Sequence, residues 1–277
     1  MKFTKMHGCG NDYVYVNLFE EKVENPAEVS IKVSDRHFGI GSDGLITIGP
    51  SDKADFRMHI YNADGSEAEM CGNGIRCVAK YVYDHHLTDN TEITVETGAG
   101  VLTLILFPEN GKVQQVRVDM GEPIHTPAEI PVVADGDKVI DEPIEVGGKT
   151  WNMTCVSMGN PHAVVFVDDT ASFPLETYGP LFENHERFPK RTNTEFVQII
   201  SRTEANMRVW ERGSAETWAC GTGTCACVMA CILNGKTEDK VLVHLRGGDL
   251  TIEYDRESNH VFMTGPATEV FSGEIEV

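Results

Sequence analysis

Two short stretches of the sequence have the same form: Met70-Cys71-Gly72-Asn73-Gly74 and Ala219-Cys220-Gly221-Thr222-Gly223. In both, a cysteine precedes Gly-x-Gly and a following segment without internal Gly or Pro, residues 75–84 or 224–234. Such a segment is typical of a helix, so we expect each cysteine at a helix N-terminus. The two cysteines are 149 positions apart, and this spacing recurs elsewhere in the chain.

The same offset relates other landmarks of the two halves. It carries Gly10-Asn11 onto Gly159-Asn160, and residues 58–62 onto residues 207–211. An accidental match would not keep one register over such distances, so we interpret the chain as an internal repeat of one structural unit.

The repeat and the strand pattern together predict the fold class. Segments that alternate between apolar and polar residues, with frequent Gly and Pro breaks, dominate both halves and favour strands. We therefore expect an α+β protein of two homologous lobes, each a curved, mostly antiparallel sheet around a central helix. We place the N-terminal lobe at residues 1–119, completed by residues 264–277, and the C-terminal lobe at residues 120–263. The active site is expected in the cleft between the lobes.

Charge and composition narrow the function classes. The 277 residues carry a formal net charge of -20, which disfavours binding to nucleic acid or to anionic membranes. Residues 1–8 lack the apolar segment of a signal peptide, so we expect a cytoplasmic protein. In that compartment the eight cysteines should be reduced thiols.

The two repeated cysteines predict acid–base chemistry. A helix N-terminus stabilises an anion, so we expect the pKa values of Cys71 and Cys220 to fall toward neutrality. If one thiolate removes an α-proton and the second thiol returns a proton to the opposite face, the carbon inverts without any cofactor. The pattern therefore indicates an amino-acid epimerase with Cys71 and Cys220 as its catalytic pair.

The remaining cysteines leave one alternative function open, which is metal binding. We expect Cys9, Cys77 and Cys155 to be buried as small apolar groups. Cys225, Cys227 and Cys231 form Cys-x-Cys-x3-Cys, which keeps a zinc or iron–sulfur site open, although the common Cys-x2-Cys spacing is absent.

Taken together, the motifs resemble those of the diaminopimelate epimerase family, and the resemblance spans nearly the whole chain. The motifs that carry it are residues 7–13 (HGCGNDY), 62–66 (NADGS), 70–76 (MCGNGIR), 159–162 (GNPH), 211–213 (ERG) and 219–223 (ACGTG). The resemblance implies a small-molecule substrate, diaminopimelate, whose LL and meso forms are interconverted on the route to lysine and bacterial cell wall. It also implies no pyridoxal phosphate and no metal.

The resemblance further implies the residues that bind the substrate. Backbone N–H groups of the two cysteine motifs would hold the reacting carboxylate, and Glu211 and His162 would lie near the reacting amino group. Arg212 suits the distal carboxylate because its guanidinium can bind in a bidentate manner. The complete expected set is Asn11, Asn62, Gly72, Asn73, Asn160, His162, Asn193, Glu211, Arg212, Gly221 and Thr222.

Two positions depart from the family pattern. Some members carry Gln where this chain has Gly44, which puts a substrate contact there in doubt, and many carry Ser in place of Thr222. Exposed strand edges in such folds often pair, which allows a homodimer.

Two other enzyme classes remain as alternatives. Proline racemase and hydroxyproline epimerase use the same two-thiol logic, but those relatives usually have His at the position of Asn73. A thiol hydrolase would need one nucleophile with an oriented His and a third group, which leaves the second cysteine unexplained.

Overall fold

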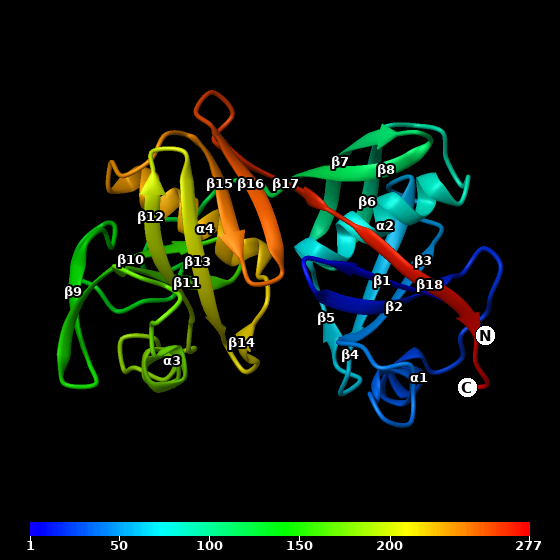
Figure 1. Ribbon diagram of the computed structural model, residues 1–277, viewed down its shortest axis with the longest axis horizontal. Helices are drawn as coiled ribbons and strands as arrows, with labels where there is room; N and C mark the ends of the chain where they lie inside the picture. The colour runs from blue at the N-terminus through cyan, green and yellow to red at the C-terminus, as the bar shows by residue number, and fades with distance from the viewer. The chain divides into compact units, whose positions relative to one another are not determined.

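The computed structural model describes residues 1–277 and divides the chain into two compact units. Unit 1 comprises residues 1–119 and 264–277, and unit 2 comprises residues 120–263 (Figure 1). Each unit is a mixed sheet with two helices, so the expected α+β fold of two homologous lobes is confirmed. No helix is both long and apolar enough to cross a membrane.

In unit 1 the strands follow one another in the order β18-β1-β2-β3-β4-β6-β7-β8, and β5 is added to β4. The pairs β2–β3 and β4–β6 are parallel, and the other pairs are antiparallel. The bounds are β1 Lys2–Gly8, β2 Asn11–Asn17, β3 Gly44–Gly49, β4 Phe56–Asn62, β5 Glu67–Ala68, β6 Glu92–Thr97, β7 Gly100–Glu109, β8 Lys112–Asp119 and β18 Thr268–Glu274.

Helix α2 (Gly72–Asp84) is the central helix of unit 1, and twelve of its thirteen residues are buried. Figure 1 shows it enclosed by the strands of its unit. Its C-terminal turn is tied to β8 by polar groups: Lys80 pairs with Asp84 at 2.7 Å and donates to the carbonyl of Val113, whose N–H donates to Asp84. Because these buried polar groups have hydrogen-bond partners, much of the cost of removing them from water is offset. The second helix, α1 (Pro26–Ser34), contacts β3 and β4.

Unit 2 repeats this topology. Its strands run in the order β9-β10-β11-β12-β13-β15-β16, β14 is added to β13, and the pairs β11–β12 and β13–β15 are parallel. The bounds are β9 Glu142–Val146, β10 Lys149–Ser157, β11 Pro161–Phe166, β12 Asn193–Ser201, β13 Glu204–Glu211, β14 Ala215–Thr217, β15 Lys240–Leu245 and β16 Gly248–Asp255; β17 (His260–Pro266) leads back into unit 1. The parallel pairs occupy the same places as in unit 1, as expected for a duplicated unit.

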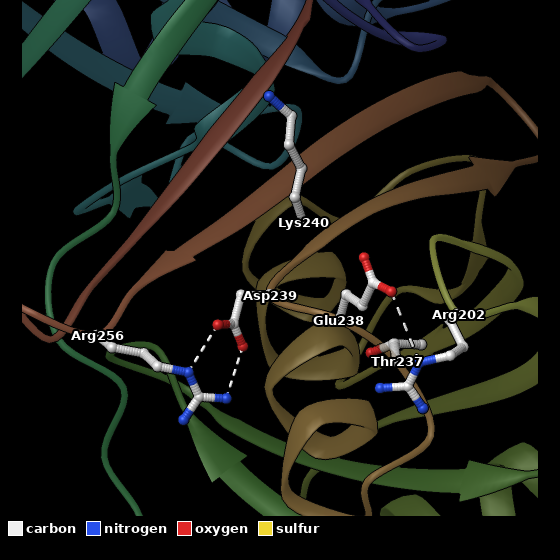
Figure 2. Close-up of a pocket in the computed structure, with 6 residues that line it drawn as sticks. All are labelled: Arg202, Thr237, Glu238, Asp239, Lys240 and Arg256. Carbon is white, nitrogen blue, oxygen red and sulfur yellow. Dashed lines mark hydrogen bonds and ion pairs between the residues drawn. The ribbon is translucent and has the colours of Figure 1, made fainter.

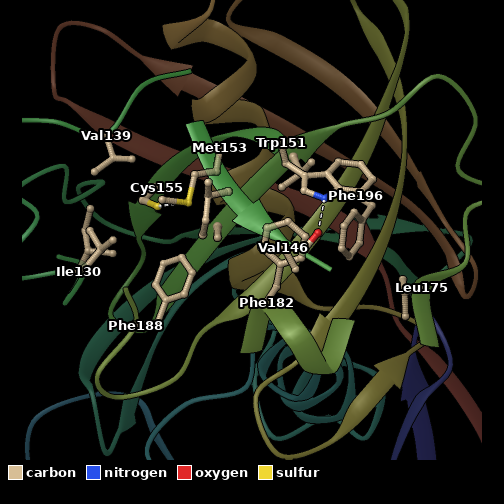
Figure 3. Packing of buried hydrophobic residues seen from close by; sticks show 14 residues of the cluster. Ile130, Val139, Val146, Trp151, Met153, Cys155, Leu175, Phe182, Phe188 and Phe196 are labelled. Carbon is tan, nitrogen blue, oxygen red and sulfur yellow. Dashed lines mark hydrogen bonds between the residues drawn. The ribbon is translucent and has the colours of Figure 1, made fainter. Parts of the chain in front are cut away.

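Helix α4 (Gly221–Leu233) is the central helix of unit 2, and α3 (Leu175–Glu183) closes an aromatic cluster beside it. Figure 3 shows this cluster, in which Trp151, Phe182 and Phe196 are buried and Trp151 donates its indole N–H to the carbonyl of Val146 at 3.2 Å. Burial of such large rings is the main source of stability in a core.

The three cysteines expected to act as small apolar groups are indeed buried. Cys155 lies within the aromatic cluster of unit 2, and Cys9 and Cys77 lie in the interior of unit 1. Burial also raises the pKa of Cys77 to about 11, so this thiol is protonated at neutral pH.

Candidate active site

Both repeated cysteines are the N-cap residues of their helices. Cys71 has extended backbone angles, and its sulfur accepts a hydrogen bond from the N–H of Gly74 at 3.2 Å. Cys220 has the same conformation, and its sulfur accepts from the N–H of Gly223 at 3.4 Å. The prediction that each cysteine stands at a helix N-terminus is therefore confirmed, and the capping bond satisfies one of the exposed N–H groups of the first turn.

The second glycine of each motif is required by close packing. A Cβ on Gly74 would stand 2.7 Å from Cδ1 of Ile46, and a Cβ on Gly223 would stand 2.4 Å from Oε1 of Glu195. Each neighbour is the third residue of its strand, β3 or β12. The absent side chains therefore let a strand residue lie directly under the first turn of each helix.

In unit 1 the thiol of Cys71 is part of a polar chain. Its sulfur donates to Oδ1 of Asn11 at 3.2 Å, and Nδ2 of Asn11 donates to Asp43 at 2.8 Å. Arg36 pairs with Asp43 at 3.0 Å and with Asp12 at 2.9 Å. Burial and the neighbouring Asp12 carboxylate raise the pKa of Asp43. This chain fixes the Asn11 amide with its oxygen toward the thiol.

Arg76 lies one turn into α2, and its hydrogen bonds hold the residues around the N-terminus of this helix in place. Its guanidinium is fully buried and donates to the carbonyl of Gly72 at 3.0 Å, to Oδ1 of Asn73 at 2.9 Å and to the carbonyl of Pro266 at 3.2 Å. No role was expected for Arg76 from the sequence; the available signal was a charged residue in the first turns of the helix, between the apolar residues Ile75 and Cys77. Asn73, expected to bind substrate, thus has its side-chain oxygen held by the protein.

Two more positions of unit 1 lie at the end of β4. Asn62 donates to the hydroxyl of Ser66 at 3.0 Å. Gly44 pairs with Asn62 in the sheet, and a Cβ at position 44 would meet the carbonyl of Tyr61 at 2.2 Å. Gly44 therefore permits close strand packing, and the backbone leaves no room there for a longer side chain.

In unit 2 the thiol of Cys220 is buried and lies 3.5 Å from the hydroxyl of Thr222. Burial raises the pKa of Cys220 well above its usual range, and the carboxylate of Glu211 raises it further. The expectation that this pKa falls toward neutrality is wrong for the ligand-free protein. The helix N-terminus is present, but loss of water around the sulfur and the nearby carboxylate of Glu211 outweigh its effect.

His162 and Asn160 form a second polar chain beside this cysteine's helix. Nδ1 of His162 lies 2.7 Å from Oε1 of Glu195, and its Nε2 lies 3.0 Å from Oδ1 of Asn160. His162 and Glu195 are both fully buried. Glu195 was not among the expected site residues; the only signal was a carboxylate inside an apolar strand.

Two further expected residues of unit 2, Glu211 and Arg212, lie at the end of β13. Glu211 accepts a hydrogen bond from the hydroxyl of Thr217. Asn193 accepts from the N–H of Arg212 at 2.9 Å and donates to the carbonyl of Pro161 at 2.7 Å. Asn193 therefore ties β11 to the Glu211-Arg212 turn through backbone groups.

The expected site residues therefore form two groups, one in each unit. Unit 1 holds Asn11, Asn62, Cys71, Gly72 and Asn73, and unit 2 holds Asn160, His162, Asn193, Glu211, Arg212, Cys220, Gly221 and Thr222.

The three further cysteines of α4 do not make a metal site. Cys225, Cys227 and Cys231 are fully buried in the helix, and no group of three or more Cys, His, Asp or Glu side chains is arranged to hold a metal ion. Contact with Cys231 and burial raise the pKa of Cys227 well above its usual range, so this thiol stays protonated.

A surface hollow of about 490 Å3 in unit 2 lies apart from these residues (Figure 2). Four of its five charged side chains pair with one another: Arg256 binds Asp239 through two hydrogen bonds of 2.6 and 2.7 Å, and Arg202 lies 3.7 Å from Glu238. None of the expected site residues lines it.

Comparison with solved structures identifies the fold. The solved structure of a PhzF-family phenazine biosynthesis protein from Bacillus anthracis matches with a TM-score of 0.73 at 17% identity, covering 100% of this chain and 99% of that one. A probable proline racemase from Agrobacterium radiobacter matches with a TM-score of 0.72 at 14% identity, covering 100% and 93%. These likenesses place the chain in the duplicated α+β fold that those proteins share.

Closer relatives identify the family. The family model for diaminopimelate epimerase matches residues 3–126 and 154–270. A diaminopimelate epimerase from Agathobacter rectalis is 81% identical over the full length of both chains, and one from Acetivibrio thermocellus is 60% identical over 100% of this chain and 99% of its own. The chain belongs to the diaminopimelate epimerase family.

Proposed function

We propose that this protein interconverts LL- and meso-diaminopimelate by moving an α-proton between Cys71 and Cys220, without a cofactor. One observation carries the proposal. At the N-terminus of α2, and again at that of α4, a cysteine caps the helix and its sulfur accepts a hydrogen bond from the second glycine of its motif. Family membership and a relative 81% identical support diaminopimelate as the substrate.

The chemistry requires a base on one face of the α-carbon and an acid on the other. One sulfur takes the proton, negative charge develops on the α-carbon and its carboxylate, and the second thiol protonates the opposite face. Backbone N–H groups in the first turns of α2 and α4 would stabilise the carboxylate as this charge grows. Gly72, Asn73, Gly221 and Thr222 supply those groups.

The proton on Cys220 suggests how a turnover begins. Because burial and the carboxylate of Glu211 raise the pKa of Cys220, this thiol is the acid in the direction in which Cys71, once it has lost its own proton, is the base. In the reverse direction the roles exchange, since each group must end in the state from which the other reaction starts.

The ends of the substrate need both donors and acceptors. We assign Glu211 and His162 to the reacting amino group, and Asn11, Asn62, Asn160 and Arg212 to the remaining ammonium and carboxylate groups. Asn193 contributes by holding the backbone of Arg212. We also propose a cytoplasmic setting, because all eight cysteines are thiols rather than disulfides.

The decisive experiment is epimerisation of LL-diaminopimelate in D2O, without pyridoxal phosphate or metal, followed by NMR and chiral chromatography. We expect meso product that carries deuterium at the inverted α-carbon, while the LL substrate that remains early in the reaction keeps its hydrogen. That asymmetry arises because the returned proton comes from a different group than the one that accepted the substrate proton.

Two results would contradict the proposal. Turnover of proline or hydroxyproline but not of diaminopimelate would overturn the substrate. Equal labelling of substrate and product at early times would point to a single acid–base group and overturn the two-thiol mechanism.

A further inference from the structure

Glu195 lies in an unusual place for an acidic residue. It belongs to β12, where it pairs with Val164 of β11 and Val209 of β13, and its side chain has no exposed surface. Its Oε1 occupies the position that a Cβ on Gly223 would need, and the sulfur of Cys220 lies 3.2 Å from the same point. The carboxyl group is therefore directly under the capped first turn of α4.

The hydrogen bonds of Glu195 indicate that it carries a proton. Its Oε1 bonds to Nδ1 of His162 at 2.7 Å, whereas its Oε2 is buried and makes no hydrogen bond. An ionised carboxylate with one oxygen unsatisfied in an apolar interior is costly, and a neutral carboxyl group is much less so. Burial also raises the pKa of Glu195 above its ordinary value of 4.5, although His162 partly offsets that effect.

This proton determines the state of His162. If Glu195 holds the proton, it donates to Nδ1, and the neutral ring keeps its hydrogen on Nε2. If the proton moves to Nδ1, the ring becomes an imidazolium, which still has hydrogen on Nε2. In both cases Nε2 donates to Oδ1 of Asn160, at 3.0 Å, and the pair has no net charge.

We propose that Glu195 is a positioning residue: through His162 it holds the Asn160 amide with its oxygen inward and its NH2 group directed to the substrate. Asn160 then offers a donor, which suits a carboxylate of the substrate and disfavours its ammonium group. The inference deepens the proposed function, since its meaning for binding rests on diaminopimelate being the substrate.

The groups that face Glu195 are compatible with this assignment. His162 comes from β11, Glu211 from β13, Cys220 and Cys227 from α4, and Cys155 from β10. The thiols are protonated, because burial raises the pKa values of Cys155 and Cys220, and contact with Cys231 together with burial raises that of Cys227. The carboxylate of Glu211 disfavours a second negative charge at Glu195.

Unit 1 provides an internal control. The repeat offset that relates Cys71 to Cys220 also relates Ile46 to Glu195 and Tyr13 to His162. Ile46 fills the space under Gly74 without any polar atom. Supporting the helix therefore does not require a carboxyl group, and Glu195 must serve something that is particular to unit 2.

The test compares Glu195→Leu, Glu195→Gln and the matched control Ile46→Leu. Leu cannot hold Nδ1 of His162, so we expect kcat/KM for diaminopimelate to fall roughly 100-fold, mainly through a higher KM, as expected for a misplaced binding group. Gln can donate its amide N–H to Nδ1 and should stay within about threefold of the wild type, because the same histidine tautomer is retained. Ile46→Leu should also stay within about threefold, since it conserves apolar volume.

A second readout needs no substrate. In histidine-ring 15N NMR of the ligand-free protein, we expect His162, identified by loss of its signal in His162→Gln, to carry hydrogen on Nε2 in the wild type and in Glu195→Gln. A bare Nε2 in the wild type would overturn the inference, as would wild-type KM in folded Glu195→Leu or a loss in Glu195→Gln as large as in Glu195→Leu. If the protein does not epimerise diaminopimelate at all, the proposed function fails, and the NMR result still decides the role of Glu195.

Discussion

The first turn of α2 in unit 1 lies on Ile46, whereas the equivalent turn of α4 in unit 2 lies on Glu195. The backbone around the two turns is the same: an extended cysteine caps the helix, and a parallel strand pair runs beneath it. The polar chains that reach the two asparagines differ, because Asn11 is held by Asp43 and Asn160 by His162. The two units therefore share one backbone arrangement, but they differ in the side chains that determine where protons are held.

The bracing of the two helices differs in the same way. Arg76 in α2 spans three acceptors of unit 1, and the repeat offset places Cys225 at the corresponding position of α4. Unit 1 thus holds its corner with a buried cation, and unit 2 holds its corner with an acid–histidine pair.

Removing either catalytic thiol should have the largest effect. We expect Cys71→Ala and Cys220→Ala to lower the epimerisation rate about 10²- to 10⁴-fold, because each removes an acid–base group from one face of the carbon. The D2O assay measures this, with Cys77→Ala as the buried-thiol control. Near wild-type turnover in either variant would show that the two corners are not a functional pair.

Loss of the buried cation should come next. Arg76→Met leaves the carbonyls of Gly72 and Pro266 without their charged donor, so we expect unfolding free energy to fall by roughly 3 kcal/mol. Cys225→Ala, at the matching position, should cost about 1 kcal/mol, since only a small apolar group is lost. Urea denaturation compares the two, and equal losses would contradict the different bracing of the units.

The two glycines offer a direct comparison of the turns. Gly223→Ala would press against Glu195, which His162 holds in place, and should cost about 1–3 kcal/mol. Gly74→Ala meets the end of the Ile46 side chain, which can change rotamer, and should cost about 1 kcal/mol or less. The reverse order in thermal or urea unfolding would mean that the carboxyl group is not held rigidly.

The smallest effect should be a pH dependence. Because the native pKa of Glu195 is raised above 4.5, the folded state binds more protons than the unfolded state above that pH, and stability falls as pH rises. Glu195→Gln lacks this loss, so its stability relative to wild type should increase with pH, by at most about 1.4 kcal/mol per unit. Parallel stability curves from pH 5 to pH 8 would contradict an uncharged Glu195.

Much of the frame could be predicted from local sequence patterns. Gly-x-Gly after each cysteine, the 149-residue offset and the alternating strands are local signals, and they led to the two lobes and the helix corners. Helix α3 was not foreseen, because Gly179 and Pro180 disfavour a helix. Gly179 is needed there because a Cβ would stand 2.4 Å from the ring of Trp210.

The support of the site could not be predicted. The contact between His162 and Glu195 depends on the parallel register of β11 and β12, which joins residues 33 positions apart. The raised pKa of Cys220 depends on how deeply the sulfur is buried and on the carboxylate of Glu211 from β13. Contacts between residues that are far apart in the sequence produce no periodic pattern from which they could be predicted.

Strand β18 belongs to unit 1 although it follows unit 2 in the chain. It pairs with β1 in an antiparallel manner; in Figure 1, β18 is red and β1 is dark blue. The amino group of Met1 also donates a hydrogen bond to the carbonyl of Ile275 at 2.7 Å. During synthesis the sheet of unit 1 therefore stays incomplete until residues 268–274 have been added. Until then β1 lacks its pairing with β18, and an open strand edge of this kind is a site for unwanted pairing with another chain.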